Sequence, residues 1–391
     1  MPSGTLRFAL IGAGFIGRIH GLALGAVNRV FGDGALAVEA TVLVDADPAL
    51  AEYQGRRLGF KHWSTDWDTA IDGVDAVIVA VPSFLHQQIA LAALARGKHV
   101  LCEKPVGRTS AEADAIAASA RVAGVSTAVG FTYIRAPMVR HAIDLVASGE
   151  LGRPVSFRGR HVEDYLADGD APFGWRLDAA LAGRCGALGD LGWHIIAIAR
   201  ALCGPVRSLN GLVSTVYGSR PEKTGEPSRR AVENEDWAAA TVTFASGATG
   251  TIEASRIAHG RRMDIGFELT CTGGTLAFDG ERGNELQLYR PGERPGEAGF
   301  RRILINGGHP DYAAFLPAPA HGLGFNDLKT IELHGFREAV AAGRNLGPDL
   351  EDSCRIARIC EAIIASSETG RRIDEPEHAP VISEAREGAF A

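Results

Sequence analysis

Short apolar runs alternate with segments of helical periodicity along the first 130 residues. The runs are apolar almost throughout, which predicts strands of a sheet covered on both faces. These strands are expected at 6–11, 38–44, 76–81, 99–102 and 126–130, and the helices between them at 16–30, 48–58, 85–96 and 111–123. Strands that alternate with helices predict right-handed crossovers and a doubly wound parallel sheet.

The pattern changes after residue 130, where segments of strand character follow one another. They are expected at 155–162, 208–216, 237–244, 249–255, 264–272, 276–279 and 286–289, with helices at 137–147, 326–342 and 349–367. Short turns between the later strands predict an antiparallel meander. The length of 391 residues suggests two domains. We therefore expect an α/β protein with domains at 1–130 and 131–391.

Two long loops interrupt the second part, at 217–235 and 290–325. The second loop is rich in Gly and Pro and contains His309 and His321. Loops longer than about 15 residues usually carry a function or are disordered. A plain surface loop or a subunit-contact arm is the alternative.

The composition is that of an ordinary globular protein, with 46% hydrophobic and 22% charged residues. A net charge of -7 argues against nucleic acid or an anionic membrane as a partner. No apolar run approaches the roughly 20 residues that span a bilayer, and the first strand begins too early for a signal peptide. Six scattered cysteines without a CxxC pair predict reduced thiols in a cytoplasmic protein and disfavour a zinc site, so no metal is expected.

A glycine-rich turn follows the first predicted strand, with Gly12, Gly14 and Gly17 in the spacing GxGxxG. The first glycine permits a tight turn, the second the approach of a pyrophosphate, and the third close packing of helix on strand. Free N–H groups at the start of the helix then face the phosphates. Because strand, turn and helix frame the glycines in this order, the motif predicts dinucleotide binding.

Asp45 ends the second predicted strand, where an acid accepts hydrogen bonds from the adenosine ribose. An acid there repels a 2′-phosphate, so NAD is predicted in preference to NADP. The alternative is that Asp45 caps the next helix, but Asp47, directly before Pro48, suits that cap better.

Lys104 follows another apolar strand and precedes Pro105. Parallel sheets bind ligands at the carboxyl ends of their strands, and an ammonium group there can polarise a hydroxyl or carbonyl oxygen. A salt bridge to Glu103 is the structural alternative.

Asp190 and His194 are four residues apart in a glycine-rich segment, which places both on one face of a helix. A carboxylate beside an imidazole supports its protonated form, as a general base for an alcohol proton requires. A capped helix with a structural histidine is the alternative. Trp175 and Arg176 lie in a predicted loop, where they either close over a nicotinamide or sugar or leave the arginine in solvent.

These motifs, in this order, resemble the Gfo/Idh/MocA family of NAD(P)-dependent sugar and cyclitol oxidoreductases. The matching segments are Gly12–Gly17, Asp45, Glu103-Lys104-Pro105, 149–152 and Gly189–His194. The resemblance covers essentially the whole chain. It implies an N-terminal Rossmann domain followed by an α/β domain with a large, open, mostly antiparallel sheet. The chain departs from many members at Pro82-Ser83 and at 131–134, where an amide side chain is absent.

The resemblance also implies which residues surround the ligands. Lys104, Asp190 and His194 would converge on the substrate, with His194 as the acid/base. The residues implied for NAD are Gly12, Gly14, Phe15, Ile16, Gly17, Asp45, Pro82, Glu103, Lys104, Trp175 and Arg176. Those implied for the substrate are Lys104, Tyr133, Arg176, Asp190, His194 and His321.

The implied reaction is NAD-dependent oxidation of a secondary hydroxyl of a cyclitol or pyranose, of the scyllo-inositol or L-glucose type, to the ketone or lactone. An anhydrosugar such as levoglucosan is the alternative substrate. An NAD-dependent glycosidase and a non-catalytic dinucleotide sensor are alternatives of another class, although a sensor needs none of Lys104, Asp190 and His194. The family's habit of forming tetramers through the open sheet implies a homotetramer, in which loop 290–325 would bring His309 or His321 to a neighbouring substrate pocket.

Overall fold

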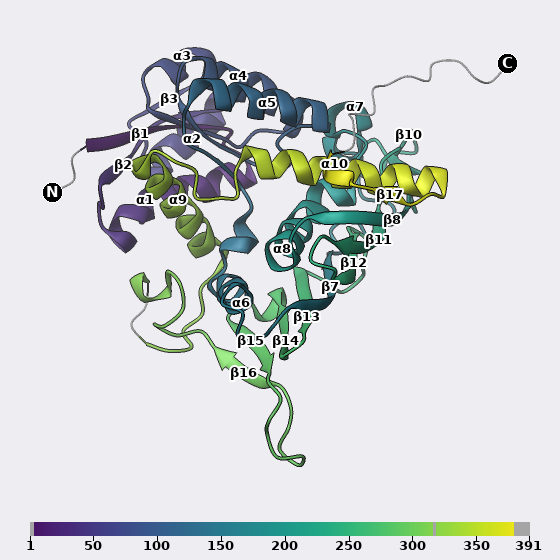
Figure 1. Cartoon of the computed structure of the whole chain (residues 1–391). Coiled ribbons are helices and arrows are strands. Elements are labelled where there is room, and N and C mark those ends of the chain that lie inside the picture. The colour runs from purple at the N-terminus through teal and green to yellow at the C-terminus, as the bar shows by residue number, and fades with distance from the viewer. Residues whose placement is uncertain (1–3, 316–317, 379–391) are drawn as a thin grey trace.

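The N-terminal part of the chain is built on a six-stranded parallel sheet (Figure 1). The computed structural model describes residues 4–315 and 318–378. The strands are β1 (Gly4–Ile11), β2 (Leu36–Val44), β3 (His62–Ser64), β4 (Ala76–Val79), β5 (His99–Cys102) and β6 (Thr127–Val129). Their spatial order, β3-β2-β1-β4-β5-β6, confirms the doubly wound sheet. The order reverses between β1 and β4, which is where such sheets bind ligands.

The helices of this part connect the parallel strands. They are α1 (Phe15–Phe31), α2 (Pro48–Leu58), α3 (Trp67–Asp72), α4 (His86–Ala95) and α5 (Ser110–Ala123). The strand β3 and the helix α3 were not expected, because both are short and carry too few apolar residues to form a recognisable run.

A helix from the far end of the sequence completes the packing of this sheet. Leu333 and Phe336 of α9 (Phe325–Ala342) belong to the same buried cluster as Phe8 of β1. The rings of Phe8 and Phe336 meet edge to face, with centroids 6.1 Å apart. Figure 1 shows α9 beside α1. The predicted boundary at residue 130 therefore separates the two sheets, while α9 returns to the first of them.

The second sheet has nine strands. They are β7 (Pro154–Val162), β8 (Val206–Ser214), β11 (Trp237–Phe244), β12 (Thr249–Ser255), β13 (Asp264–Cys271), β14 (Gly274–Asp279), β15 (Glu285–Tyr289), β16 (Arg301–Leu304) and β17 (Ile373–Asp374). Their order is β16-β15-β14-β13-β7-β12-β11-β8-β17, and only β7 and β12 pair in parallel. The mostly antiparallel sheet is confirmed.

The expected meander is wrong at one place, because β7 lies between β12 and β13. The segment between Ser255 and Asp264 is long enough to cross the roughly 10 Å between two strands that flank a third. Sequence pattern does not reveal this insertion, since β7 is separated from both neighbours by long stretches of chain. The hairpin of β9 (Ser219–Pro221) and β10 (Arg229–Ala231) within loop 217–235 was also not expected.

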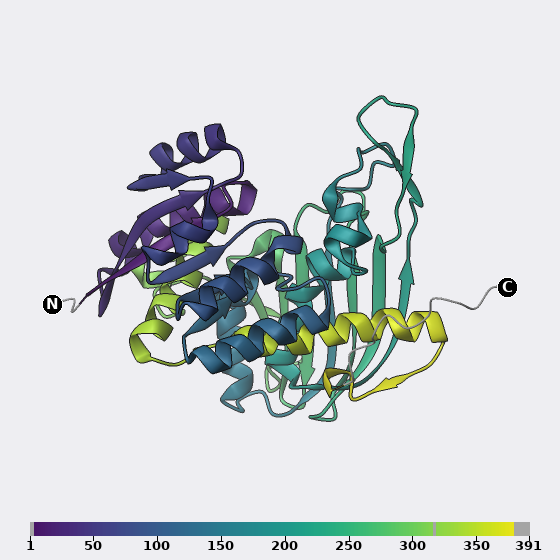
Figure 2. The same ribbon diagram turned by 90° about the horizontal axis from the view of Figure 1, so that it is seen from above.

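Helices cover one face of the second sheet. They are α6 (Pro137–Ala147), α8 (Trp193–Cys203) and α10 (Leu350–Thr369), and the short α7 (Ala179–Ala182) lies to the side. Figure 2 shows α10 running alongside α5, so it joins the two parts of the chain. The other face is open, with Leu212 58% exposed.

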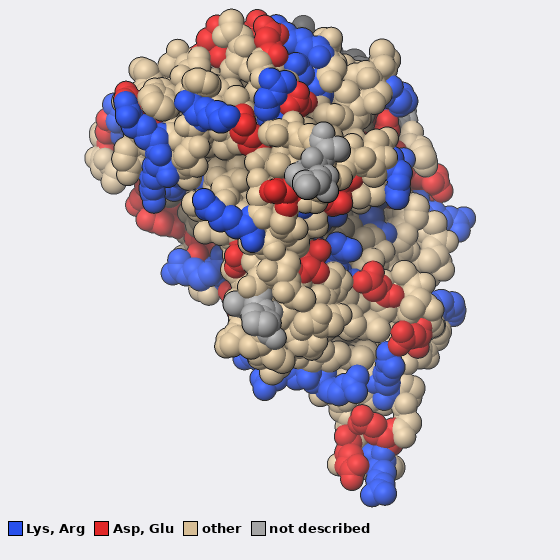
Figure 3. Space-filling view, turned by 90° about the vertical axis from the view of Figure 1, so that its left-hand side faces the viewer, with Lys and Arg blue, Asp and Glu red and all other residues tan. Residues whose placement is uncertain are grey.

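The surface charges and the state of the cysteines can be compared with what the composition predicted. Figure 3 shows Lys and Arg interspersed with Asp and Glu over the face drawn, without a large area of one sign. All six cysteines lie in the described part and none is paired. Among the described residues, no helix has both the length and the apolar character needed to cross a bilayer.

Candidate active site

The glycine turn between β1 and α1 has the geometry that a bound dinucleotide requires. Gly12 has a φ of +106°, and a side chain at Gly17 would collide with the Gly12 carbonyl. Around Gly14 the space is open, with no atom within 4 Å of the position that a Cβ would take. Helix α1 begins without a side-chain cap and without an acid in its first turn. Its free N–H groups therefore fit a pyrophosphate.

Asp45 is fixed against this turn. Its Oδ2 accepts a hydrogen bond of 2.8 Å from the N–H of Ala13. Asp47, not Asp45, caps α2 by accepting from the N–H groups of Ala49 and Leu50, as predicted. Asp45 therefore does not cap α2. It lies beside the glycine turn, where the adenosine ribose of a bound dinucleotide would lie.

A cavity of about 340 Å³ opens between the two sheets, at the carboxyl ends of β5, β6 and β7. Nine residues predicted for ligand binding line it, namely Phe15, Ile16, Glu103, Lys104, Tyr133, Trp175, Arg176, Asp190 and His194. The structure therefore brings together residues from five separate segments of the chain. Its size suits a monosaccharide-sized ligand with part of a cofactor.

Lys104 and Asp190 form an ion pair across this cavity. The Lys104 Nζ lies 3.0 Å from Asp190 Oδ1, and it also donates to the Asp190 carbonyl oxygen. Burial by itself would raise the pKa of Asp190, but Lys104 and Arg176 hold that pKa well below its usual range. The side-chain partner of Lys104 is thus Asp190, and not Glu103 as in the structural alternative.

Asp190 does not bond to His194, contrary to the expectation from their spacing. Its Oδ2 instead accepts a 2.6 Å hydrogen bond from the Tyr165 hydroxyl and lies 3.4 Å from Arg176 Nε. Asp190 belongs to a π-helical turn, Leu188–Gly192, which precedes α8. The cationic and phenolic donors around the cavity attract the carboxylate more strongly than a neutral imidazole does.

His194, at the start of α8, is buried between aromatic rings. Its ring centroid lies 4.7 Å from that of Tyr133 and 5.6 Å from that of His161. Among the described residues, none bonds to its Nδ1. Burial, and then the charge of Lys104, hold the pKa of His194 well below its usual value. His194 is therefore neutral near pH 7 and able to accept a proton.

Trp175 and Arg176 lie at the mouth of the cavity. The Arg176 guanidinium lies over the Trp175 ring, 4.5 Å from its centroid, and half of the arginine side chain is exposed. The carbonyl of Arg176 accepts from Asn234 Nδ2 at 2.8 Å, which fastens this loop to the segment that precedes β11. The pair therefore presents an aromatic face and a cation to an incoming ligand.

Three further predicted positions lie outside the cavity lining. Pro82 lies between Val81 and Ser83, which do line it. His321 is exposed and does not reach the cavity of its own chain, and residues 316 and 317 of its loop lie outside the described residues. His309 is buried against His141, with ring centroids 4.7 Å apart, so it is not available to a neighbouring pocket.

The cavity lining also includes residues that the sequence did not indicate, among them His161, Glu163 and Tyr165. They follow one another at every second position at the end of β7. Alternate residues of a strand point to the same face, so this period of two was the available signal. His161 is held by the Leu191 carbonyl and by Glu163, at 3.1 and 3.2 Å.

The chain matches two family models, one over the first sheet and one over the strands from β7 to β14 of the second. Residues 6–131 match the oxidoreductase family with an NAD-binding Rossmann fold, and residues 139–277 match the GFO/IDH/MocA C-terminal domain. A levoglucosan dehydrogenase of Pseudarthrobacter phenanthrenivorans is 36% identical over 386 residues, which cover 95% of this chain and 99% of that protein. The NAD-dependent scyllo-inositol 2-dehydrogenase of Bacillus subtilis is 29% identical over 69% of this chain and 73% of its own length.

Solved structures agree with this assignment. Levoglucosan dehydrogenase in complex with NADH and levoglucosan superposes with a TM-score of 0.91 at 36% identity, covering 95% of this chain and all of that one. The chain therefore belongs to the Gfo/Idh/MocA family and is an oxidoreductase with an NAD-binding Rossmann domain.

Proposed function

We propose that this protein is an NAD-dependent dehydrogenase that oxidises a secondary hydroxyl on a six-membered polyol ring, a pyranose or a cyclitol. One observation carries the proposal. The Lys104 ammonium, fixed on Asp190, and the neutral imidazole of His194 line the same cavity, which begins at Phe15 and Ile16 beside the glycine turn.

Each of the site residues has a separate role in alcohol oxidation. Bound NAD+ supplies the acceptor for the hydride that leaves the carbon. His194 takes the hydroxyl proton, since it is neutral and makes no hydrogen bond to a described side chain. Lys104 keeps a donor free for the oxygen on which charge develops. Asp190 holds Lys104 in place and does not orient His194, which revises the expected role of Asp190.

The similarity to levoglucosan dehydrogenase supports an anhydropyranose or pyranose as the substrate, since it extends over the full chain. The scyllo-inositol or L-glucose type stays a second candidate, supported by the partial similarity to a scyllo-inositol 2-dehydrogenase. Tyr133, Tyr165 and Trp175 offer the aromatic surface, and Glu163 the acceptor, that a polyhydroxylated ring requires.

A substrate panel tests the proposal. Purified protein with NAD+ is mixed with levoglucosan, L-glucose, scyllo-inositol, myo-inositol or D-glucose, and the formation of reduced cofactor is followed at its absorbance maximum. We expect steady formation of NADH with at least one ring polyol. Sugar release from a glycoside without net NADH would indicate the glycosidase alternative, and no reaction with any ring polyol would refute the dehydrogenase proposal.

Cofactor preference gives a prediction for Asp45. The substitution Asp45→Ser should narrow the preference for NAD over NADP by tenfold or more, because repulsion between unit charges about 4 Å apart costs about 1–4 kcal/mol near a protein surface. The ratio of kcat/KM for the two cofactors measures it. Asp47→Ser is the matched control, since it changes only the cap of α2. An unchanged ratio in Asp45→Ser would place the ribose elsewhere.

We also propose a cytoplasmic homotetramer built through the open sheet. Loop 290–325 is fastened to the body of its own chain by Asn284, whose Oδ1 accepts a 2.8 Å hydrogen bond from the N–H of Leu323. The exposed side chain of His321 is then available to a neighbouring subunit, beside its substrate. The mass in solution, measured by light scattering, tests the assembly, and a fully active monomer would contradict it.

A further inference from the structure

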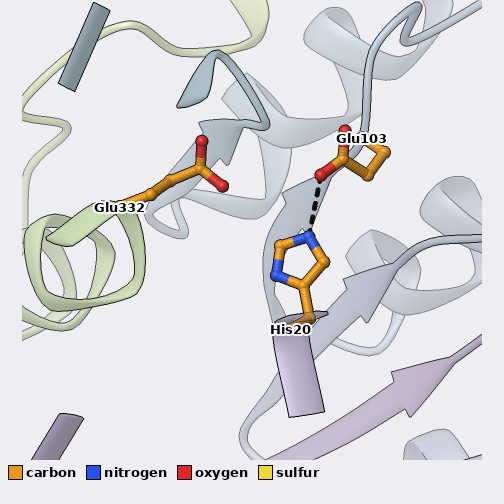
Figure 4. Close-up of side chains that lie close together, drawn as sticks. All are labelled: His20, Glu103 and Glu332. Atoms are coloured by element: carbon orange, nitrogen blue, oxygen red, sulfur yellow. Dashed lines mark hydrogen bonds and ion pairs between the residues drawn. The ribbon is translucent and has the colours of Figure 1, made fainter. Parts of the chain in front are cut away.

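A buried cluster of charged groups lies directly behind Lys104. His20 of α1, Glu103 at the end of β5, and Lys329 and Glu332 of α9 are each at most 5% exposed. Figure 4 shows His20 and Glu103 pointing toward each other, with Glu332 facing them across a gap. His20 Nε2 lies 2.8 Å from Glu103 Oε1. The cluster thus joins three elements that are far apart in the sequence.

The arrangement is one that could otherwise hold a metal ion. Ligand atoms of His20, Glu103 and Glu332 lie within 4.8 Å of one another. However, the Lys329 Nζ donates to both carboxylates, at 2.5 Å to Glu103 and 2.6 Å to Glu332. Its ammonium supplies the positive charge that a metal ion would bring. In this chain, the cation between the two carboxylates is therefore the side chain of Lys329.

The charges of Lys329 and Glu103 depend on each other. Burial by itself would raise the pKa of Glu103, but Lys329 and His20 hold that pKa well below its usual range. Burial would likewise lower the pKa of Lys329, and the two carboxylates raise it above its usual value. Both groups stay charged in the interior only because they are paired, since an unpaired buried charge is costly.

Glu103 transmits this arrangement to the active site. Its second carboxylate oxygen, Oε2, accepts from the backbone N–H of Lys104 at 3.3 Å. On the other side, Gly130 leaves room for the carboxylate, which would lie 2.6 Å from a Cβ at that position. Glu103 also lines the cavity next to Lys104. The Glu103 carboxylate is therefore held by His20 and Lys329, and it in turn holds the backbone of Lys104.

We infer that Lys329 is a positioning residue of the active site, which holds the carboxylate of Glu103 in place and thereby sets the position of the Lys104 ammonium. This inference rests on the role proposed for Lys104 in hydroxyl oxidation. It assigns a function in catalysis to α9, although Lys329 itself does not line the cavity.

The substitution Lys329→Met removes the charge while keeping the length of the side chain. We expect kcat to fall by about 10- to 100-fold, as a misplacement of about 1 Å in an active site does. The KM for the polyol and the binding of NADH, followed by its fluorescence, should change little. A purely structural role would instead lower the fraction of folded protein without separating kcat from KM.

Two further variants separate the inference from a loss of folding. Glu332→Gln is the matched control, because it removes the other partner of Lys329 but leaves the pair with Glu103, and it should keep most of the activity. Made in the Glu332→Gln background, Glu103→Gln combined with Lys329→Met leaves neither carboxylate of the cluster charged and unpaired. If Lys329 acts through Glu103, this combination loses no more kcat than Glu103→Gln in the same background. Additive losses would refute the inference, as would equal losses in Glu332→Gln and Lys329→Met.

A crystal structure of Lys329→Met beside one of the unmodified protein gives a readout independent of turnover. We expect the Glu103 carboxylate to shift and Lys104 Nζ to move from its place 3.0 Å from Asp190 Oδ1. Unmoved Glu103 and Lys104 would overturn the inference whatever the substrate is. If the unmodified protein oxidises no ring polyol while Lys104 does move in the variant, the proposed function fails and the positioning role stands.

Discussion

Replacing His194 with asparagine should lower kcat by about 10²- to 10⁴-fold, the contribution typical of a general base. The imidazole lines the cavity, is neutral, and makes no hydrogen bond to a described side chain that would occupy it. Asparagine is smaller, is polar and does not accept a proton at these pH values. The rate of NADH formation at saturating polyol and NAD+ measures the loss, and NADH binding shows that the variant is folded.

His161→Asn is the matched control, because His161 lines the same cavity 5.6 Å from His194 between ring centroids. Its two ring nitrogens are already engaged by Leu191 and Glu163, so its loss should cost less. Near-full turnover in His194→Asn would mean that another group is the base. A larger loss in His161→Asn than in His194→Asn would exchange the two roles.

The pH dependence follows from the same environment. A base works only in its neutral form, so kcat/KM is retained above the pKa of His194 and lost as the pH falls through it. Burial and the charge of Lys104 place that pKa well below 6.5. Activity should therefore stay level from neutral pH to below pH 6.5, and His194→Asn should remove the remaining acid limb.

Much of the fold was predictable from sequence because its signals are local. Apolar runs such as 99–102 end where the strands end, and Asp47 before Pro48 marks the start of α2. The position of β7 between β12 and β13 was not predictable, because strand pairing over a large sequence separation leaves no local pattern. The packing of α9 on the N-terminal sheet is hidden for the same reason.

The candidate site was likewise predictable from sequence only where its signals are local. The glycine turn and Lys104 follow strands directly, so the sheet alone places them at one edge. The partner of Asp190 could not be read from its spacing to His194, because Lys104 and Tyr165 approach it from other elements. Likewise Glu103 lines the cavity, but the pairing of its carboxylate with Lys329 has no local signal in the sequence. Competition between partners distant in sequence decides such contacts.

Lys104→Met should lower kcat/KM by about 10²- to 10³-fold, the loss typical of one donor that stabilises a developing oxyanion. The side chain lies in the cavity with Asp190 as its anchor, and only 15% of it is exposed, so water replaces the ammonium poorly. Methionine keeps the length of the side chain. Steady-state kinetics with the best ring polyol of the substrate panel measure the loss.

A double variant distinguishes a Lys104 that donates to the substrate from one that is only a structural partner of Asp190. If the pair is only structural, Lys104→Met loses activity because the Asp190 carboxylate no longer has the ammonium group beside it. Adding Asp190→Asn would then remove the unpaired charge and restore activity. If Lys104 stabilises the oxygen of the substrate, the double variant stays as impaired as Lys104→Met, since neither residue supplies the missing charge. Restored turnover in the double variant would therefore refute the catalytic role, and continued impairment with intact NADH binding supports it.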